Sequence, residues 1–278
     1  MTSTFTVTLV SDGIKRFAIY RDPGTRPQDA VIWLHGGNGQ AKLFLEEIRP
    51  RSNVVDVVPQ GSETGDHPGW VNAWEAENDI PKGAPDNLVD IRFVGLLEQH
   101  VRSTCPSVTR VWLCGFSAGG GLVWGTWGIS GAWGKGITVR DKFAGLCIVG
   151  KQLRRRPGRG WNWQESPKVA MPFVMVHGSG DKPDGTDPED NYSWEESYAQ
   201  ARMVNGNTTT SSKPDTRIEC LRRTYNIRLK CASGGLASSA RYLVEGMGHE
   251  WVNCTEFHTD DLVMERFMAY GLGSTIGK

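Results

Sequence analysis

The sequence lacks the features that would point to a membrane or to nucleic acid. It has no apolar stretch close to the roughly 18 residues that a membrane span requires. Its 31 basic and 31 acidic residues cancel, so no overall field draws the chain onto DNA, RNA or anionic lipid. Residues 1–10 lack the basic start and apolar run of a secretion signal. We therefore expect a cytoplasmic protein, unless a leader was removed, with no nucleic-acid or membrane partner.

The cysteines lack the spacing of a metal site. The six cysteines include no Cys-x-x-Cys pair and no ligand set at zinc-site intervals, so the sequence predicts no metal. Whether Cys220 and Cys231 face each other in a disulfide stays open. In a cytoplasmic protein we expect both to be reduced.

Apolar runs of strand length recur along the chain, whose 278 residues fit one α/β domain spanning 1–278. Segments 5–10 and 16–20 alternate apolar and polar residues on either side of Ser11-Asp12-Gly13, which predicts an antiparallel hairpin. The later runs are nearly continuous, which is typical of strands buried on both faces of a parallel sheet. These runs are residues 30–34, 54–58, 111–114, 143–149, 172–176 and 240–244.

Segments of helical pattern separate these runs. The predicted helices are residues 86–103, 119–127, 192–204 and 259–270. This alternation predicts an α/β fold with a mostly parallel, doubly wound sheet and an N-terminal antiparallel hairpin. We expect the least regular segments, 61–85, 151–167 and 205–214, to be loops above the sheet that shape a pocket.

Residues 115–119 read Gly-Phe-Ser-Ala-Gly and match the G-x-S-x-G motif of the α/β-hydrolase fold. The motif follows a predicted strand and precedes a predicted helix, which is the context that it requires. A strained turn at this place presents the Ser117 hydroxyl above the sheet. Glycine is needed at Gly115 and Gly119 because a Cβ there would collide with neighbouring elements. We therefore predict that Ser117 is a nucleophile.

Serine is a weak nucleophile, so it needs a base, and the base needs an acid to orient it. His249 follows the last predicted strand, which is the final place in the order serine, acid, histidine. Asp181 lies close to the end of its own predicted strand and is the expected acid. Asp184, Asp187 and Asp190 are rivals, although the neighbouring prolines and glycines favour turns or helix caps there.

A tetrahedral intermediate of acyl transfer needs two backbone N–H donors. Ala118, the residue after the nucleophile, is expected to supply one of them. The other is expected from the glycine-rich segment 35–39, which follows an early strand and allows the backbone to approach a substrate. We favour Gly37 as this donor, with Asn38 next.

Tryptophan is abundant, with 11 residues. Loop tryptophans either cap a core or line a pocket for a flat or aromatic substrate, and both interpretations stay open. The candidate substrate contacts are His35, Trp70, Trp74 and Trp251.

Four motifs occur in a fixed order along the chain: Leu34-His35-Gly36-Gly37, the run from Gly115 to Gly120, the run from His177 to Asp181, and the run from Gly246 to Trp251. Together they resemble the polyhydroxybutyrate depolymerase and feruloyl esterase family. Segments 69–74 and 89–93 also resemble that family's Trp- and Asn-bearing loop and its helix before the nucleophile strand. The resemblance covers residues 15–270, and its narrower marks are Ser-Ala-Gly-Gly and Gly-His-Glu-Trp.

The resemblance implies ester hydrolysis by Ser117, Asp181 and His249 without a metal or cofactor. It implies a small-molecule or oligomeric ester, of the feruloyl, acetyl or hydroxyalkanoate type. The chain departs from the family at Val252, where members carry proline, in the long acidic segment after Asp181, and in the missing secretion signal. These departures concern the substrate rather than the chemistry.

Two other functions share the same motifs. A serine peptidase of this fold would bind a substrate amine through an acidic pair, for which Glu75 and Glu77 are available. A non-catalytic binding scaffold would retain the fold alone. The ordered serine, acid and histidine argue against the scaffold, because a binding module does not need all three.

Overall fold

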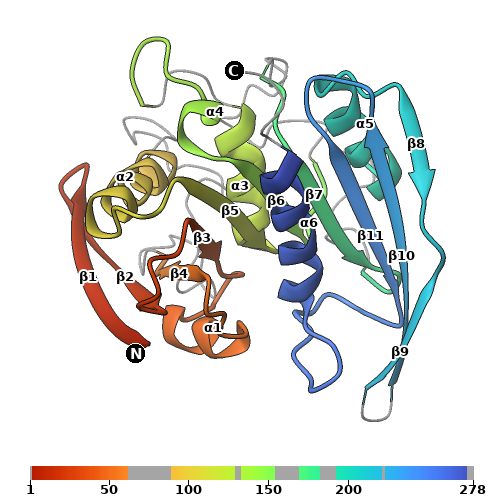
Figure 1. Ribbon diagram of the computed structural model, residues 1–278, viewed down its shortest axis with the longest axis horizontal. Helices are drawn as coiled ribbons and strands as arrows, with labels where there is room; N and C mark the ends of the chain where they lie inside the picture. Colours follow the sequence, from red (N-terminus) through yellow and green to blue (C-terminus); the bar gives the residue numbers. More distant parts are fainter. Residues whose placement is uncertain are drawn as a thin grey trace.

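The computed structural model describes residues 2–61, 89–128, 133–153, 169–181, 192–220 and 223–273. In this part of the chain one 11-stranded sheet runs in the order β1-β2-β4-β3-β5-β6-β7-β11-β10-β8, with β9 paired to β10 (Figure 1). The strands are β1 (Ser3–Ser11), β2 (Ile14–Asp22), β3 (Asp29–Leu34), β4 (Val54–Pro59), β5 (Arg110–Phe116), β6 (Gly145–Val149), β7 (Phe173–Gly178), β8 (Thr209–Ser212), β9 (Thr216–Cys220), β10 (Arg223–Ser233) and β11 (Ser239–Glu245).

The centre of the sheet is parallel, as the continuous apolar runs predict. Strands β4, β3, β5, β6, β7 and β11 pair in parallel, each with the next. Every residue of β3, β4, β6 and β7 is buried. Because helices cover both faces, these strands do not show the alternation of a half-exposed strand.

The predicted N-terminal hairpin is confirmed. Strands β1 and β2 pair antiparallel, with Ser11 opposite Ile14. The two turn residues, Asp12 and Gly13, have φ values of +52° and +77°. Positive φ at both positions suits a tight turn whose twist matches the flanking strands, and Asp-Gly is a favoured pair for it.

Helices cover the sheet in two layers (Figure 1). They are α1 (Ala41–Glu47), α2 (Val89–Thr104), α3 (Ala118–Gly128), α4 (Val139–Lys142), α5 (Trp194–Val204) and α6 (Thr259–Gly273). Buried residues of α2, α3 and α5 belong to one apolar cluster, and those of α1 and α6 belong to the other. Among the described helices, none has both the length and the apolar content to cross a membrane.

The fold differs from the prediction in two short helices, α1 and α4, that were not predicted, and in the strands at the C-terminal edge of the sheet. Segment 205–214, expected to be a loop above the sheet, contains β8, which pairs with β10 at the edge of the sheet. All four residues of β8 are exposed, so it lacks the apolar alternation by which strands are recognised. Strands β9 and β10 were also not predicted, although Tyr225, Ile227 and Leu229 of β10 are buried at every second position.

Candidate active site

The functional motifs lie where parallel strands end. Ser117 directly follows β5, Asp181 lies three residues after β7, and His249 lies four residues after β11. The segment from His35 to Gly39 follows β3, the neighbour of β5. The carboxyl ends of parallel strands share one edge of the sheet, where open α/β sheets bind their ligands.

The turn at Ser117 is strained, as the motif requires. Ser117 has φ +52°, a left-handed conformation that a non-glycine residue rarely adopts. The Ser117 N–H donates to the Val149 carbonyl at 2.8 Å, which fixes the turn against β6. A Cβ at Gly115 would collide with the Gly119 backbone, and one at Gly119 would collide with the Leu34 carbonyl. The steric reason expected for both glycines is therefore confirmed.

Ser117, His249 and Asp181 form a continuous hydrogen-bonded chain. His249 Nε2 lies 2.7 Å from Ser117 Oγ, and His249 Nδ1 lies 2.8 Å from Asp181 Oδ1. An ionised carboxylate only accepts, so Nδ1 carries the ring hydrogen and Nε2 accepts from the serine hydroxyl. The Asp181 side chain is 2% exposed and the His249 side chain is 42% exposed. The acid is therefore shielded, while the imidazole is open to an incoming molecule.

Phe116, the variable residue before Ser117, packs against the imidazole of His249. Its ring stacks on His249 with centroids 5.3 Å apart and planes 29° from parallel. The same ring meets Trp251 edge-on at 6.0 Å. A Cβ at Gly36 or at Gly150 would lie 3.2 Å from the Phe116 ring, so both backbones approach it closely. The G-x-S-x-G pattern leaves this position unspecified, so nothing in the motif predicted the contact.

Hydrogen bonds of the His35 ring hold in place the segment that we expect to supply an oxyanion donor. The Gly61 N–H donates to His35 Nε2 at 2.9 Å, so the proton lies on Nδ1, 2.7 Å from the Gly36 carbonyl oxygen. Burial lowers the pKa of His35, which keeps the ring neutral. His35 is 1% exposed, so these contacts favour a supporting role over the predicted contact with substrate.

The two predicted oxyanion donors belong to segments that lie beside Ser117. Ala118 begins α3, where the first N–H groups of a helix have no intrahelical acceptor. A Cβ at Gly36 would lie 3.3 Å from Ser117 Cβ, which brings the segment containing Gly37 next to the nucleophile. Asn38, the alternative donor, has φ +60°. The donor role of Gly37 and Ala118 stays a prediction.

Trp194 holds the backbone of Asp181 in place through contacts that the sequence motif did not predict. The Trp194 indole N–H donates to the Asp181 carbonyl at 3.2 Å. The Trp194 ring stacks on His177, with centroids 4.4 Å apart and planes 8° from parallel. Burial, together with the positive charge of Arg241, lowers the pKa of His177 to about 4, so this ring is neutral at pH 7.

Trp251 lies in a cluster of aromatic rings beside the candidate site. It meets Phe44 at 5.0 Å and Trp33 at 6.0 Å, both edge-on, in addition to Phe116. It is only partly buried, and it lines an open cavity of about 760 Å³ together with Cys220 and Cys254. Its predicted contact with substrate stays a prediction. Trp124 and Trp127, by contrast, are each 3% exposed and belong to the core.

Several predicted residues lie outside the described residues. They are the substrate-contact candidates Trp70 and Trp74, the acidic pair Glu75 and Glu77, and the rival acids Asp184, Asp187 and Asp190.

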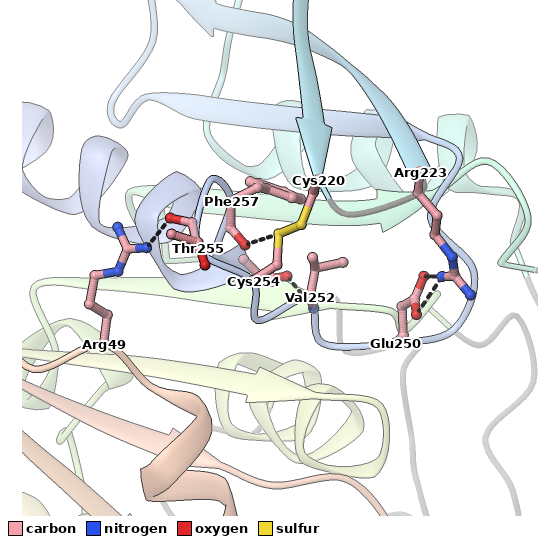
Figure 2. The surroundings of a disulfide bond; sticks show 9 residues. Arg49, Cys220, Arg223, Glu250, Val252, Cys254, Thr255 and Phe257 are labelled. Carbon is pink, nitrogen blue, oxygen red and sulfur yellow. Dashed lines mark hydrogen bonds and ion pairs between the residues drawn. A yellow bond between two sulfur atoms is a disulfide. The ribbon is translucent and has the colours of Figure 1, made fainter.

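The structure places a disulfide between Cys220 and Cys254 (Figure 2). Pairing of Cys220 with Cys231 is therefore wrong, and so is the expectation that Cys220 is reduced. Cys220 pairs in register with Arg223 on β10, whereas Cys231 lies eight residues farther along that strand. At about 3.3 Å per residue these positions are roughly 26 Å apart, far beyond the reach of a disulfide.

In the described part of the chain, one group of side chains lies close enough to share a metal ion. The ligand atoms of Cys220, Cys254 and Glu256 all lie within 4.8 Å of one another. Because the two sulfurs are bonded to each other, neither is available as a thiolate ligand.

Comparison with known proteins finds relatives by structure alone. No protein-family model matches the sequence, and no curated protein matches it. Among solved structures, an S-formylglutathione hydrolase from Agrobacterium tumefaciens aligns with TM-score 0.61 at 12% identity, over 96% of this chain and 95% of that one. Zea mays acyl-protein thioesterase 2 aligns with TM-score 0.54 at 16% identity, over 97% and 99%. Thermogutta terrifontis esterase 2, phosphorylated by paraoxon, aligns with TM-score 0.52 at 13% identity, over 96% and 91%.

These similarities concern the arrangement of the chain, because sequence identity is low in all three. Each alignment spans nearly the full length of both proteins. Within this chain, the described residues form a mostly parallel central sheet with an antiparallel N-terminal hairpin. The chain has the α/β-hydrolase fold.

Proposed function

We propose that this protein is a serine carboxylesterase that hydrolyses a small or aromatic carboxylic ester through an acyl-enzyme on Ser117. The observation that carries the proposal is the chain of hydrogen bonds from Ser117 through His249 to Asp181, at 2.7 and 2.8 Å. A structural role alone does not require a strained serine whose hydroxyl faces a partly exposed imidazole backed by a buried carboxylate.

The geometry supports acylation in the following way. Ser117 Oγ attacks the ester carbonyl carbon while His249 Nε2 takes the hydroxyl proton. Asp181 holds the Nδ1 hydrogen and stabilises the imidazolium that forms. The carbonyl oxygen becomes an oxyanion, for which the N–H groups of Ala118 and Gly37 are the proposed donors. The alkoxide then leaves with the proton from Nε2, and the acyl group remains on Ser117.

Deacylation repeats these steps with water as the nucleophile. His249 takes a proton from water, and the resulting oxygen attacks the acyl carbon. Collapse of the second tetrahedral intermediate breaks the bond to Ser117 Oγ, which regains its proton from Nε2. The free acid leaves, and no metal or cofactor takes part in these steps.

The proposed substrate class follows from the motif resemblance and from the aromatic rings beside Ser117 and His249. The motif resemblance favours feruloyl, acetyl or hydroxyalkanoate esters, and the aromatic rings around Phe116 and Trp251 suit a flat acyl or alcohol group. Two proteins of the same fold are named for S-formylglutathione and for acyl-protein thioesters. A screen should therefore compare aryl, alkyl and feruloyl esters with a matched thioester and an acyl-peptide.

The decisive experiment measures hydrolysis of para-nitrophenyl acetate by the wild type and by Ser117→Ala. We expect the variant to lose several orders of magnitude in kcat. Ser211→Ala, on the exposed strand β8, is the matched control and should retain wild-type activity. Paraoxon should add a diethylphosphoryl group to the Ser117 peptide, detected by mass spectrometry. Faster cleavage of the acyl-peptide than of every ester would favour a peptidase. A wild type that reacts with neither para-nitrophenyl acetate nor paraoxon would favour a binding scaffold.

A further inference from the structure

Phe116 contacts His249 on a side that the proposed catalytic groups leave free. Asp181 and Ser117 bind the two ring nitrogens, in the plane of the imidazole. Phe116 instead stacks on the face of that ring, at 5.3 Å between centroids. A contact on the face can change the stability of the charged imidazole without competing for either hydrogen bond.

The environment of Phe116 holds its ring in place. Its neighbours are Trp251 at 6.0 Å on one edge and the backbones at Gly36 and Gly150. Trp251 is in turn fixed by Phe44 at 5.0 Å. The ring thus has little room to turn away from His249, even though the imidazole itself is partly exposed.

Three charged residues of the described chain lie next to His249 through hydrogen bonds, ion pairs or sequence. Asp181 is bonded to Nδ1, and Glu250, the next residue, pairs with Arg223 at 2.9 Å. The Glu250 carboxylate also accepts from the Gly248 N–H. The carboxylates favour the imidazolium and Arg223 opposes it, and none of the three residues is changed by a substitution at Phe116.

We propose that Phe116 is a positioning residue whose aromatic face holds the His249 ring and stabilises its protonated form. The inference rests on the proposed function, in which His249 is neutral before the attack and protonated in the transition state. An aromatic ring carries negative charge density on its face and attracts a cation stacked there. This attraction raises the pKa of the imidazole and lowers the barrier to proton transfer.

The first measurement follows the pKa of His249 by NMR titration of the histidine 13Cε1 signal, assigned by its absence in His249→Gln. Phe116→Leu keeps an apolar side chain but removes the aromatic face. We expect the pKa of His249 to fall by roughly half a unit, since an exposed cation–π contact has this magnitude. Phe116→Tyr restores the face and should restore the wild-type value.

Phe143→Leu is the matched control, because Phe143 is a buried phenylalanine that contacts Trp133 and none of the rings around His249 named above. It should leave the pKa of His249 unchanged even if it lowers the thermal midpoint. An unchanged pKa in Phe116→Leu, or an equal fall in Phe143→Leu, would overturn the proposal. If Phe116→Leu does not fold, fluorinated phenylalanines at position 116 weaken the ring face with little change of shape. The pKa should then fall with each added fluorine, and a constant pKa across the series contradicts the proposal.

Kinetics provide a second readout that a purely structural contact would not give. In Phe116→Leu the acid limb of kcat/KM should move to lower pH, together with the pKa of His249. The plateau kcat should fall about two- to fivefold, because the imidazolium of the transition state loses the same contact. If the wild type hydrolyses no ester or peptide, the proposed function fails, while the NMR titration still tests the contact itself.

Discussion

The indole N–H of Trp194 donates to the backbone carbonyl of Asp181 at 3.2 Å, and thus ties the first turn of α5 to the segment that presents the acid. Asp181 lies three residues after β7, and its own N–H donates to the Gly178 carbonyl at 3.3 Å. Ser193, the residue before Trp194, caps α5 through a reciprocal hydrogen bond with Glu196. The helix end is therefore ordered locally and can serve as a fixed support.

Trp194→Phe should lower kcat for the ester by about two- to tenfold, because it removes one hydrogen bond of ordinary strength while keeping a ring to stack on His177. KM should change little, since the indole of Trp194 contacts the backbone of Asp181 rather than a bound substrate. Trp127→Phe removes a similar bond, from an indole to the Val169 carbonyl at 2.9 Å, and is the control. Equal losses of kcat in the two variants would mean that the bond to Asp181 has no special role.

Asp181→Asn should reduce kcat by about 10⁴-fold. The carboxylate keeps the ring hydrogen of His249 on Nδ1 and stabilises the imidazolium, and a neutral amide does neither as well. Asp187→Asn should leave kcat within about twofold of the wild type, because the bond to His249 comes from Asp181. Both variants would be assayed on the same ester under saturating conditions. Comparable losses in the two would show that the acid has been misassigned.

The sequence predicted which three side chains come together at the candidate site better than it predicted what surrounds them. Ser117, Asp181 and His249 lie at the ends of buried parallel strands, and continuous apolar runs together with glycine-rich turns mark such places in any sequence. Phe116 and Trp194 could not be predicted in this way. Their roles depend on rings brought together by β5, α5 and the segment after β11, which are far apart along the chain.

The strands at the C-terminal edge of the sheet also could not be predicted from sequence patterns. Strand β8 is entirely exposed and polar, so its pairing with β10 leaves no apolar pattern to detect. The partner of Cys220 depends on where β9 ends relative to the segment after His249, which the spacing of cysteines does not encode. Disulfides persist mainly in oxidising compartments, so this pair weighs against the cytoplasmic location expected from residues 1–10.

His177 should make the protein lose stability in mild acid. Its pKa is about 4 in the folded state, against about 6.5 when unfolded, so between these values the unfolded chain binds the extra proton. The contribution of His177 to the free energy of unfolding is therefore fully present above pH 6.5. It decreases as the pH is lowered and stops decreasing near pH 4. The loss amounts to at most about 3 kcal/mol.

His177→Phe keeps a ring to stack on Trp194 but cannot be protonated. Urea unfolding at pH 7.5 and pH 4.5 should therefore show a smaller difference in the variant than in the wild type. His35, also buried with a lowered pKa, remains in both proteins and contributes equally to each. An identical pH dependence in the two would exclude His177 as the cause.

The Cys220–Cys254 disulfide should stabilise the fold by linking β9 to the segment that follows His249 (Figure 2). The two cysteines are 34 residues apart in sequence, and closing a loop of that length in the unfolded chain is worth about 2–4 kcal/mol. Dithiothreitol should thus lower the thermal midpoint of the wild type. Cys220→Ser should lower it by a similar amount and remove any further effect of the reductant.

Cys231→Ser is the control, because Cys231 is a free thiol, and this variant should keep the full response to dithiothreitol. A wild-type midpoint that is the same with and without dithiothreitol would contradict a stabilising disulfide at this position.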